Sequence, residues 1–284
     1  LFFCCGAFIM SDLGRSTAPY ILSVANQKGG VGKTTTTINL AAALVERGAR
    51  VLLVDLDPQG NASTGLGLPP SGRKKTTYDL LIDEVPLVDT VVETDIDGLL
   101  ICPSTADLSS ADIQLVANEK RSFLLHDALR EPRVDTLDLD FILIDCPPSL
   151  SLLTVNAMVA SHAVLVPLQA EFFALEGLSQ LMLTIREVRR GANAGLRIEG
   201  VVLTMVDSRN RLSQQVENDA RSTLGDLVFK TMIPRNVRVS EAPSYALPVL
   251  SYDTSSKGSE AYRNLAGEVL ARHPISRHPK EEVN

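Results

Sequence analysis

The segment that most constrains this chain is a glycine-rich loop between an apolar run and a stretch with helical spacing. Residues 20–25 (YILSVA) have no polar face, which is typical of a buried parallel strand. Residues 34–47 place apolar side chains at helical spacing and stop at Gly48, and residues 50–55 form a second apolar run. The order strand, glycine loop, helix, strand predicts a parallel α/β unit.

The loop itself reads GGVGKT over residues 29–34. Glycines let backbone N–H groups point inward, and the helix N-terminus adds partial positive charge, so the loop predicts a phosphate site. Lys33 would reach the β- and γ-phosphates of a nucleotide, Thr34 would ligate Mg²⁺, and Thr35 would bond an α-phosphate oxygen. The alternative is a plain tight turn, which the flanking strand and helix disfavour.

The loop departs from the pattern G-x-x-x-x-G-K-[ST] at its first position, where Gln27 replaces glycine. A second lysine, Lys28, stands five residues before Lys33. A lysine at the loop entrance cannot easily fold onto the phosphates of its own site. We therefore expect Lys28 to cross a dimer interface and reach the nucleotide of a second copy.

Carboxylates follow two of the apolar runs. Asp55 and Asp57 close the run at residues 50–55, and Asp145 ends the run DFILID. Ligands of open parallel sheets bind at the carboxyl ends of strands, where acids can hold Mg²⁺ or orient an attacking water. Asp145 matches the Walker B pattern and would hold magnesium through water. Function is favoured over a helix cap for Asp57 and Asp145, and both interpretations stay open for Asp55.

Predicted strands and helices alternate along the rest of the chain. Strands are expected at residues 98–102, 140–146, 162–168, 200–206 and 227–232, and helices at residues 106–119, 122–129, 152–160, 175–190, 212–224 and 259–272. This alternation predicts an α/β fold, a single domain with a mostly parallel twisted sheet and helices on both faces.

The chain divides into an N-terminal extension (residues 1–19), one domain (residues 20–272) and a polar tail (residues 273–284). We interpret residues 1–9 as lying upstream of the natural start, because Met10 and a polar segment follow them. The 68–75 segment (LPPSGRKK) is expected to be a surface loop.

Composition excludes several classes of protein. The net charge of −7 excludes a uniformly basic nucleic-acid binder, but residues 184–238 hold ten Lys/Arg against six Asp/Glu, so a local basic surface remains possible. The four cysteines form no C-x-x-C, which disfavours a disulfide framework or a zinc site and fits a reducing cytoplasm. No apolar run approaches the roughly 20 residues of a membrane span.

Several motifs together resemble a known family. The segments KGGVGKTT (28–35), DLDPQGN (55–61) and DCPPS (145–149) resemble the deviant Walker A ATPases. The segments EFFALEGLSQ (171–180), GVVLTM (200–205) and IPRNVRVSEAPS (233–244) are similar to the ParA/Soj chromosome-partitioning ATPases. The resemblance covers residues 20–270, and its last motif is the most specific to that branch.

The resemblance implies an ATPase with weak basal activity that forms an ATP-sandwich homodimer with Mg²⁺. Lys33 and Thr34 would act in cis and Lys28 in trans, Asp57 would position the hydrolytic water, and Asp145 would be the Walker B acid. The implied ATP-binding residues are Lys28, Gly29, Gly30, Val31, Gly32, Lys33, Thr34, Thr35, Pro234 and Asn236, of which Pro234 and Asn236 would pack on and bond the adenine.

The resemblance also implies partners. The ATP dimer would bind double-stranded DNA without sequence preference through Arg209 and Arg238, and a ParB-type centromere-binding protein would stimulate hydrolysis and release it. The expected location is the cytoplasm, on the nucleoid, with no membrane partner. Arg186, Arg189 and Arg190 stay open between a DNA contact and a solvated helix face.

Other functions remain as alternatives. A related ATPase could position a plasmid or a protein cargo on the nucleoid, and a non-hydrolysing, nucleotide-gated scaffold is disfavoured by the intact Lys33 and Asp57. A membrane-attached MinD-type relative is disfavoured because residues 271–284 hold two prolines and few apolar side chains.

Overall fold

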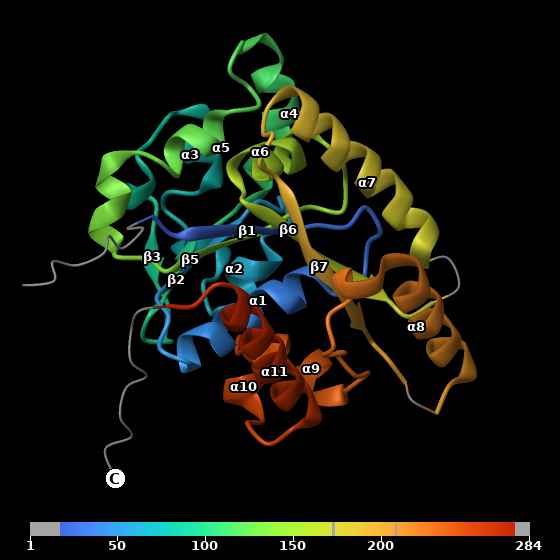
Figure 1. The fold of residues 1–284 in the computed structure, drawn as a ribbon. Helices are drawn as coiled ribbons and strands as arrows, with labels where there is room; N and C mark the ends of the chain where they lie inside the picture. The colour runs from blue at the N-terminus through green and yellow to red at the C-terminus, as the bar shows by residue number, and fades with distance from the viewer. Residues whose placement is uncertain (1–17, 172–173, 208, 276–284) are drawn as a thin grey trace, which may run out of the picture.

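The computed structural model describes residues 18–171, 174–207 and 209–275. They form a seven-stranded sheet in the order β3-β4-β2-β5-β1-β6-β7, in which β3 and β4 are antiparallel and every other pair of neighbours is parallel (Figure 1). The strands are β1 Tyr20–Val24, β2 Val51–Asp55, β3 Val92–Glu93, β4 Leu99–Cys102, β5 Phe141–Asp145, β6 Ala163–Gln169 and β7 Arg197–Thr204. The predicted α/β class is confirmed.

Helices cover both faces of this sheet (Figure 1). They are α1 Lys33–Glu46, α2 Asn61–Gly65, α3 Thr77–Ile82, α4 Ala111–Gln114, α5 Leu124–Ala128, α6 Leu152–Ala160, α7 Ala174–Gly191, α8 Arg211–Leu224, α9 Val237–Glu241, α10 Val249–Tyr252 and α11 Lys257–Arg272. One buried cluster joins the sheet to α3, α5, α6, α7 and α8, and the other joins it to α1, α10 and α11. Alternate strand residues feed the two clusters, which is why the strands read as continuous apolar runs.

The strand register aligns the chemistry-bearing ends of the central strands. Asp55 at the end of β2 pairs in register with Asp145 at the end of β5, and Val24 of β1 pairs with Asp145 on its other side. The phosphate loop leaves β1 at this same edge. Sequence positions more than 80 residues apart therefore meet at one edge of the sheet.

Residues 227–232 were expected to form a strand, and this prediction is wrong. The segment makes only an isolated bridge, Val201 to Val228, beside β7. The Phe229 ring covers Gly200, where a Cβ would lie 2.5 Å from the ring. The next two backbone N–H groups, of Lys230 and Thr231, donate to the Glu268 carboxylate of α11 instead of to a strand.

The single helix expected at residues 106–119 is also wrong, because the segment breaks into two 3₁₀ turns around the short α4. The Ser110 hydroxyl donates to the Asp107 carbonyl at 2.7 Å, a local bond that competes with helix continuation. Leu108, Ala111 and Leu115 are buried, but Ile113 and Val116 are mostly exposed, so only part of the apolar spacing there marks a buried face.

Among the described residues, none of the helices has the length and apolar character needed to cross a bilayer. The expectation for residues 1–9 and most of the expected tail lie outside the described residues.

Candidate nucleotide site

The phosphate loop is fixed by hydrogen bonds to two strands, β6 and β7. The Asn26 amide donates to the Pro167 carbonyl at 2.7 Å and accepts the Lys28 N–H at 3.0 Å. The Thr204 hydroxyl, at the end of β7, donates to the Val31 carbonyl at 2.8 Å. Gly32 begins α1 with a φ of 85°, a conformation that favours glycine. The loop is therefore held open by contacts to β6 and β7.

Lys33 lies inside this loop. Its side chain is buried, and its Nζ donates to the Lys28 carbonyl across the loop mouth at 3.1 Å. Burial lowers the pKa of Lys33 below its ordinary value, and the carboxyls of Asp145 and Asp57 oppose that shift. A buried ammonium held by a carbonyl is suited to receive phosphate oxygens.

The Lys28 side chain leaves the loop in a different direction. Its Nζ forms an ion pair with Glu171 Oε2 at 3.1 Å, and both side chains are about half exposed, at 41% and 47%. The Lys28 ammonium is therefore engaged outside the loop, by Glu171. Its reach into a second copy stays a prediction.

Two buried carboxyls lie side by side behind the loop. Asp55 accepts from the Ser63 hydroxyl at 2.6 Å and the Ser63 N–H at 2.9 Å, and Asp145 accepts from the Thr37 hydroxyl at 3.0 Å. Burial raises the pKa of Asp55 to about 6, against these hydrogen bonds. Burial and the charge of Asp55 raise the pKa of Asp145 to about 8. A nearby cation would therefore stabilise the ionised forms of both carboxyls.

The residues fit a magnesium ion. Asp145 Oδ2 is buried and has no hydrogen-bond partner among the described residues, and the Thr34 hydroxyl is close enough to lower the pKa of this carboxyl. A hydroxyl and a carboxylate are hard oxygen donors, which Mg²⁺ prefers. In the described ranges no group of three or more His, Cys, Asp or Glu could hold a metal. Thr34 and Asp145 would therefore hold the magnesium ion together with a phosphate of the nucleotide.

Asp57 lies in the turn after β2, 7% exposed. Its Oδ1 accepts the Gln59 N–H at 2.9 Å, and its own N–H donates to Asp55 at 3.2 Å. Its charge is close enough to act on Lys33. A nearly buried carboxylate beside the phosphate loop can hold a water against a phosphate group.

A cavity of about 400 Å³ opens beside the loop. Its lining includes Gly32, Thr35, Pro234 and Asn236, so the structure brings the segment expected to contact adenine next to the phosphate loop. The Asn236 side chain caps α9 by accepting the Arg238 N–H at 2.8 Å. The volume is in the range of small-molecule pockets.

Sequence reasoning missed Arg73, which lies within the expected surface loop but is buried. Its guanidinium donates to the carbonyls of Leu68 and Ser104 and to the Thr64 hydroxyl. Gly60 has a φ of 62°, and a Cβ there would lie 2.9 Å from the Ser104 carbonyl oxygen and also meet this guanidinium, so the position favours glycine. The arginine fixes the turn that carries Asp57, and nothing in the local sequence distinguishes it from the lysines that follow.

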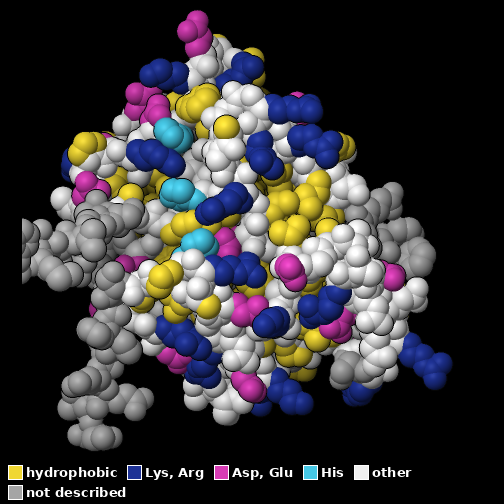
Figure 2. Space-filling model, viewed as in Figure 1, with side chains coloured by type: hydrophobic (Ala, Val, Ile, Leu, Met, Phe, Trp, Pro, Cys, Tyr) yellow, Lys and Arg dark blue, Asp and Glu magenta, His cyan; other side chains and the backbone are white. Residues whose placement is uncertain are grey.

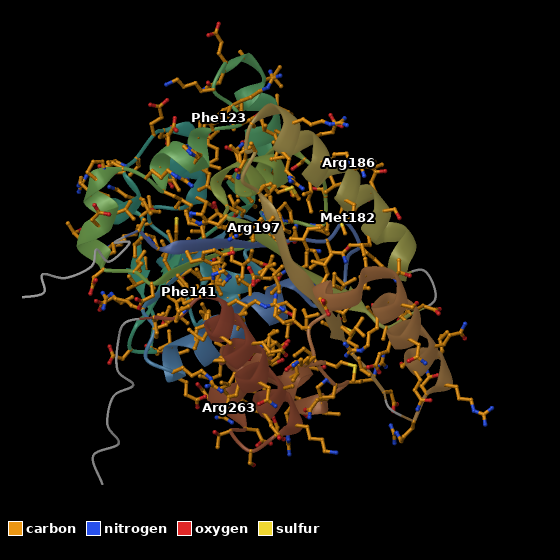
Figure 3. All side chains as sticks on the ribbon, viewed as in Figure 1. Phe123, Phe141, Met182, Arg186, Arg197 and Arg263 are labelled. Carbon is orange, nitrogen blue, oxygen red and sulfur yellow. The ribbon has the colours of Figure 1, made fainter. Side chains whose placement is uncertain are left out.

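The arginines expected to contact DNA are exposed and already paired. Arg209 binds Asp207, and Arg238 binds Glu241 at 3.0 Å and Asp253 at 3.2 Å. Arg186 lies on α7 (Figure 3). Dark blue Lys and Arg side chains are spread over the visible face with acids between them (Figure 2), so this face shows no single basic patch.

Comparison with known proteins agrees with this geometry. A family profile described as an AAA domain matches residues 20–198. A chromosome partitioning protein ParA from Caulobacter vibrioides is 57% identical over 252 residues, covering 89% of this chain and 94% of that protein. The sporulation initiation inhibitor protein Soj of Bacillus subtilis is 49% identical over 251 residues, covering 88% of this chain and 98% of that protein.

A solved structure of a cobyrinic acid a,c-diamide synthase from Mycobacterium smegmatis, with bound ADP and magnesium, superposes with a TM-score of 0.78 and 38% identity, covering 91% of this chain and 97% of that one. The phosphate loop and the aligned strand-end carboxylates define the class, a P-loop nucleoside triphosphatase of α/β fold. Within that class, the chain belongs to the ParA/Soj family of chromosome-partitioning ATPases.

Proposed function

We propose that this chain is an ATP-dependent DNA-partitioning ATPase whose ATP-bound dimer binds DNA without sequence preference. The observation that carries the proposal is that two lysines of the loop take different positions. Lys33 is buried in the phosphate loop, whereas Lys28 points out of it toward Glu171. A lysine outside its own site is available to a nucleotide held by a second copy.

The nucleotide site would work through pre-positioned charge. Lys33 and the loop N–H groups hold the β- and γ-phosphates, and Asp57 holds the attacking water. Thr34 and Asp145 would hold Mg²⁺, which when bound would supply positive charge against the phosphates. The base enters the cavity lined by Pro234 and Asn236. No group in this set is an arginine finger, which supports weak basal hydrolysis.

The dimer would act as the switch. Lys28 exchanges its contact with Glu171 for the partner's phosphates, so joining two chains depends on the γ-phosphate. Joining brings two copies of Arg209 and Arg238 onto one duplex, where phosphate contacts alone suffice for non-specific binding. A ParB-type partner then stimulates hydrolysis, and the dimer and DNA separate. Nucleoid association in the cytoplasm follows from this cycle.

DNA co-sedimentation with ATP, ADP or no nucleotide tests the proposal, with dimerisation followed by light scattering on the same samples. We expect dimers and DNA retention with ATP alone, and neither in Lys33→Gln. Lys74→Gln, which removes an exposed lysine of the same charge, is the matched control and should behave as the unchanged protein. Equal retention in all three nucleotide states, or a persistent monomer with a non-hydrolysable ATP analogue, would overturn the proposal.

A further inference from the structure

Arg209 is held in a two-point ion pair by Asp207. Arg209 Nε lies 3.0 Å from Asp207 Oδ1, and Arg209 Nη2 lies 3.0 Å from Oδ2. The backbone N–H of Arg209 also donates to Oδ1, at 3.1 Å. A guanidinium uses this same fork to bind a phosphate. A DNA phosphate that approaches Arg209 in this way must therefore displace the Asp207 carboxylate.

Asp207 also acts on a second guanidinium. Asp207 and Arg235 line a cavity of about 460 Å³ at the end of β7. The contacts with Arg209 and the charge of Arg235 lower the pKa of Asp207 to about 2, so its carboxylate stays ionised near neutral pH. One acid thus offsets two arginines at the surface where DNA binding is proposed.

The pair lies on solvent, which limits its strength. The Arg209 side chain is 89% exposed and that of Asp207 is 30% exposed. Exposed ion pairs are weak and are screened by salt. Such a carboxylate reduces the affinity for one phosphate only modestly, but a duplex that engages several arginines at once can displace it.

We propose that Asp207 competes with DNA phosphates for Arg209 and so keeps the affinity of a single chain for DNA low. The inference rests on the proposed DNA-binding function and adds a regulatory residue to the same surface. Two copies of Arg209 must then act together, which makes DNA retention depend more steeply on dimerisation.

The test is the substitution Asp207→Asn. The side-chain oxygen of the introduced amide can still accept the Arg209 N–H, so the turn is kept, while the negative charge is removed. Binding is measured by fluorescence anisotropy with a short random-sequence duplex, in ATP, across a salt series. We expect Asp207→Asn to bind about two- to fivefold more tightly at low salt, with the gain shrinking as salt rises.

Three further variants separate competition from other effects. Asp207→Glu keeps the carboxylate and should bind close to the unchanged protein. In the Arg209→Gln background, Asp207→Asn should gain less affinity than it gains in the unchanged protein, because the Arg209 contact is already lost and only Arg235 still responds to the Asp207 charge. Glu46→Gln removes one charge from another two-point pair, Arg263–Glu46 of α11 and α1 (Figure 3 labels Arg263), and should leave DNA affinity unchanged.

Weaker binding by Asp207→Asn would overturn the inference and show that the carboxylate orients Arg209 for DNA. Unchanged binding would also overturn it, and so would an equal gain in Glu46→Gln, which would reduce the effect to net charge. If the unchanged protein binds no DNA in any nucleotide state, the proposed function fails with it. If the unchanged protein binds DNA but Asp207→Asn binds no more tightly, the inference about Asp207 fails while the proposed function stands.

Discussion

The buried strand ends and the exposed arginines are held in place by different means. At the strand ends, Asp55 and Asp145 are fixed by backbone register and by hydrogen bonds from buried hydroxyls, and the buried Lys33 donates to a backbone carbonyl. On the surface, Arg209 and Arg238 are held by nearby carboxylates that solvent can replace. The buried strand ends have a single arrangement, whereas the exposed arginines can exchange one anionic partner for another.

This difference sets what each region can do. A buried charge without a partner costs free energy, so the strand ends bind strongly to groups of opposite charge. Lys33 would bind a phosphate, and the carboxyls would bind a cation. Exposed arginines pass from one anion to another at little cost. A nucleotide site needs the first property, and reversible binding to any stretch of DNA needs the second.

The largest effect should come from the buried side of the comparison. Lys33→Gln removes the ammonium that faces the phosphates, and we expect ATP affinity to fall about 10- to 100-fold, the range for hydrogen bonds to a charged group. Isothermal titration calorimetry measures this directly. Lys74→Gln is the charge-matched control. Unchanged affinity in Lys33→Gln would show that the loop does not bind phosphate.

Asp57 tests the chemistry of the same region. We expect Asp57→Ala to lower ATP hydrolysis about 100-fold while ATP still binds, because the carboxylate acts on the water. Phosphate release gives the rate, and DNA retention with ATP should persist for longer. Asp57→Asn keeps an acceptor for the Gln59 N–H and controls for the turn. Rapid hydrolysis in Asp57→Asn would rule out a role for the carboxylate charge.

The two regions also differ in how far the sequence predicts them. The strands β1, β2 and β5 are continuous apolar runs that end in a glycine loop or an acid, so both the sheet edge and its residues follow from local pattern. The approach of Asp55 to Asp145 follows as well, since parallel strands align their carboxyl ends. Buried chemistry is predictable because the fold itself positions it.

Contacts between segments far apart in the chain could not be predicted from local sequence patterns. The partner of Lys28 is Glu171, 143 positions away, and the hydroxyl that fixes the loop belongs to Thr204, 173 positions from Val31. The expected strand at residues 227–232 failed because Glu268, on α11, binds the N–H groups of that segment. Each contact depends on how strands and helices far apart in the sequence pack together, which a single sequence does not encode locally.

Arg209 should give a smaller effect than the buried residues. Arg209→Ala removes one phosphate contact from each chain, and we expect the slope of log affinity against log salt to fall by about two for a dimer. ATP binding should be unchanged, because Arg209 does not line the base cavity. The salt series described for Asp207→Asn measures both quantities. A slope equal to that of the unchanged protein would place the DNA surface elsewhere.

The remaining effect is on stability rather than on binding or hydrolysis. The pKa of Asp145 is raised to about 8 in the folded chain, so folding favours the protonated acid. The stabilisation is full below the unfolded pKa of about 4 and is lost as pH rises toward 8, with a slope of about 1.4 kcal/mol per pH unit. Asp145→Asn should flatten this loss, measured by urea unfolding at pH 5 and pH 8 without nucleotide or Mg²⁺.

The exposed acid gives the opposite expectation. The folded pKa of Asp207 is lowered to about 2, so any stabilisation from it is present above pH 4 and is lost only as pH falls from 4 toward 2. Asp207→Asn should therefore leave the change in stability between pH 5 and pH 8 as it is in the unchanged protein. If Asp145→Asn kept that same pH dependence, burial would not be what separates the strand ends from the surface arginines.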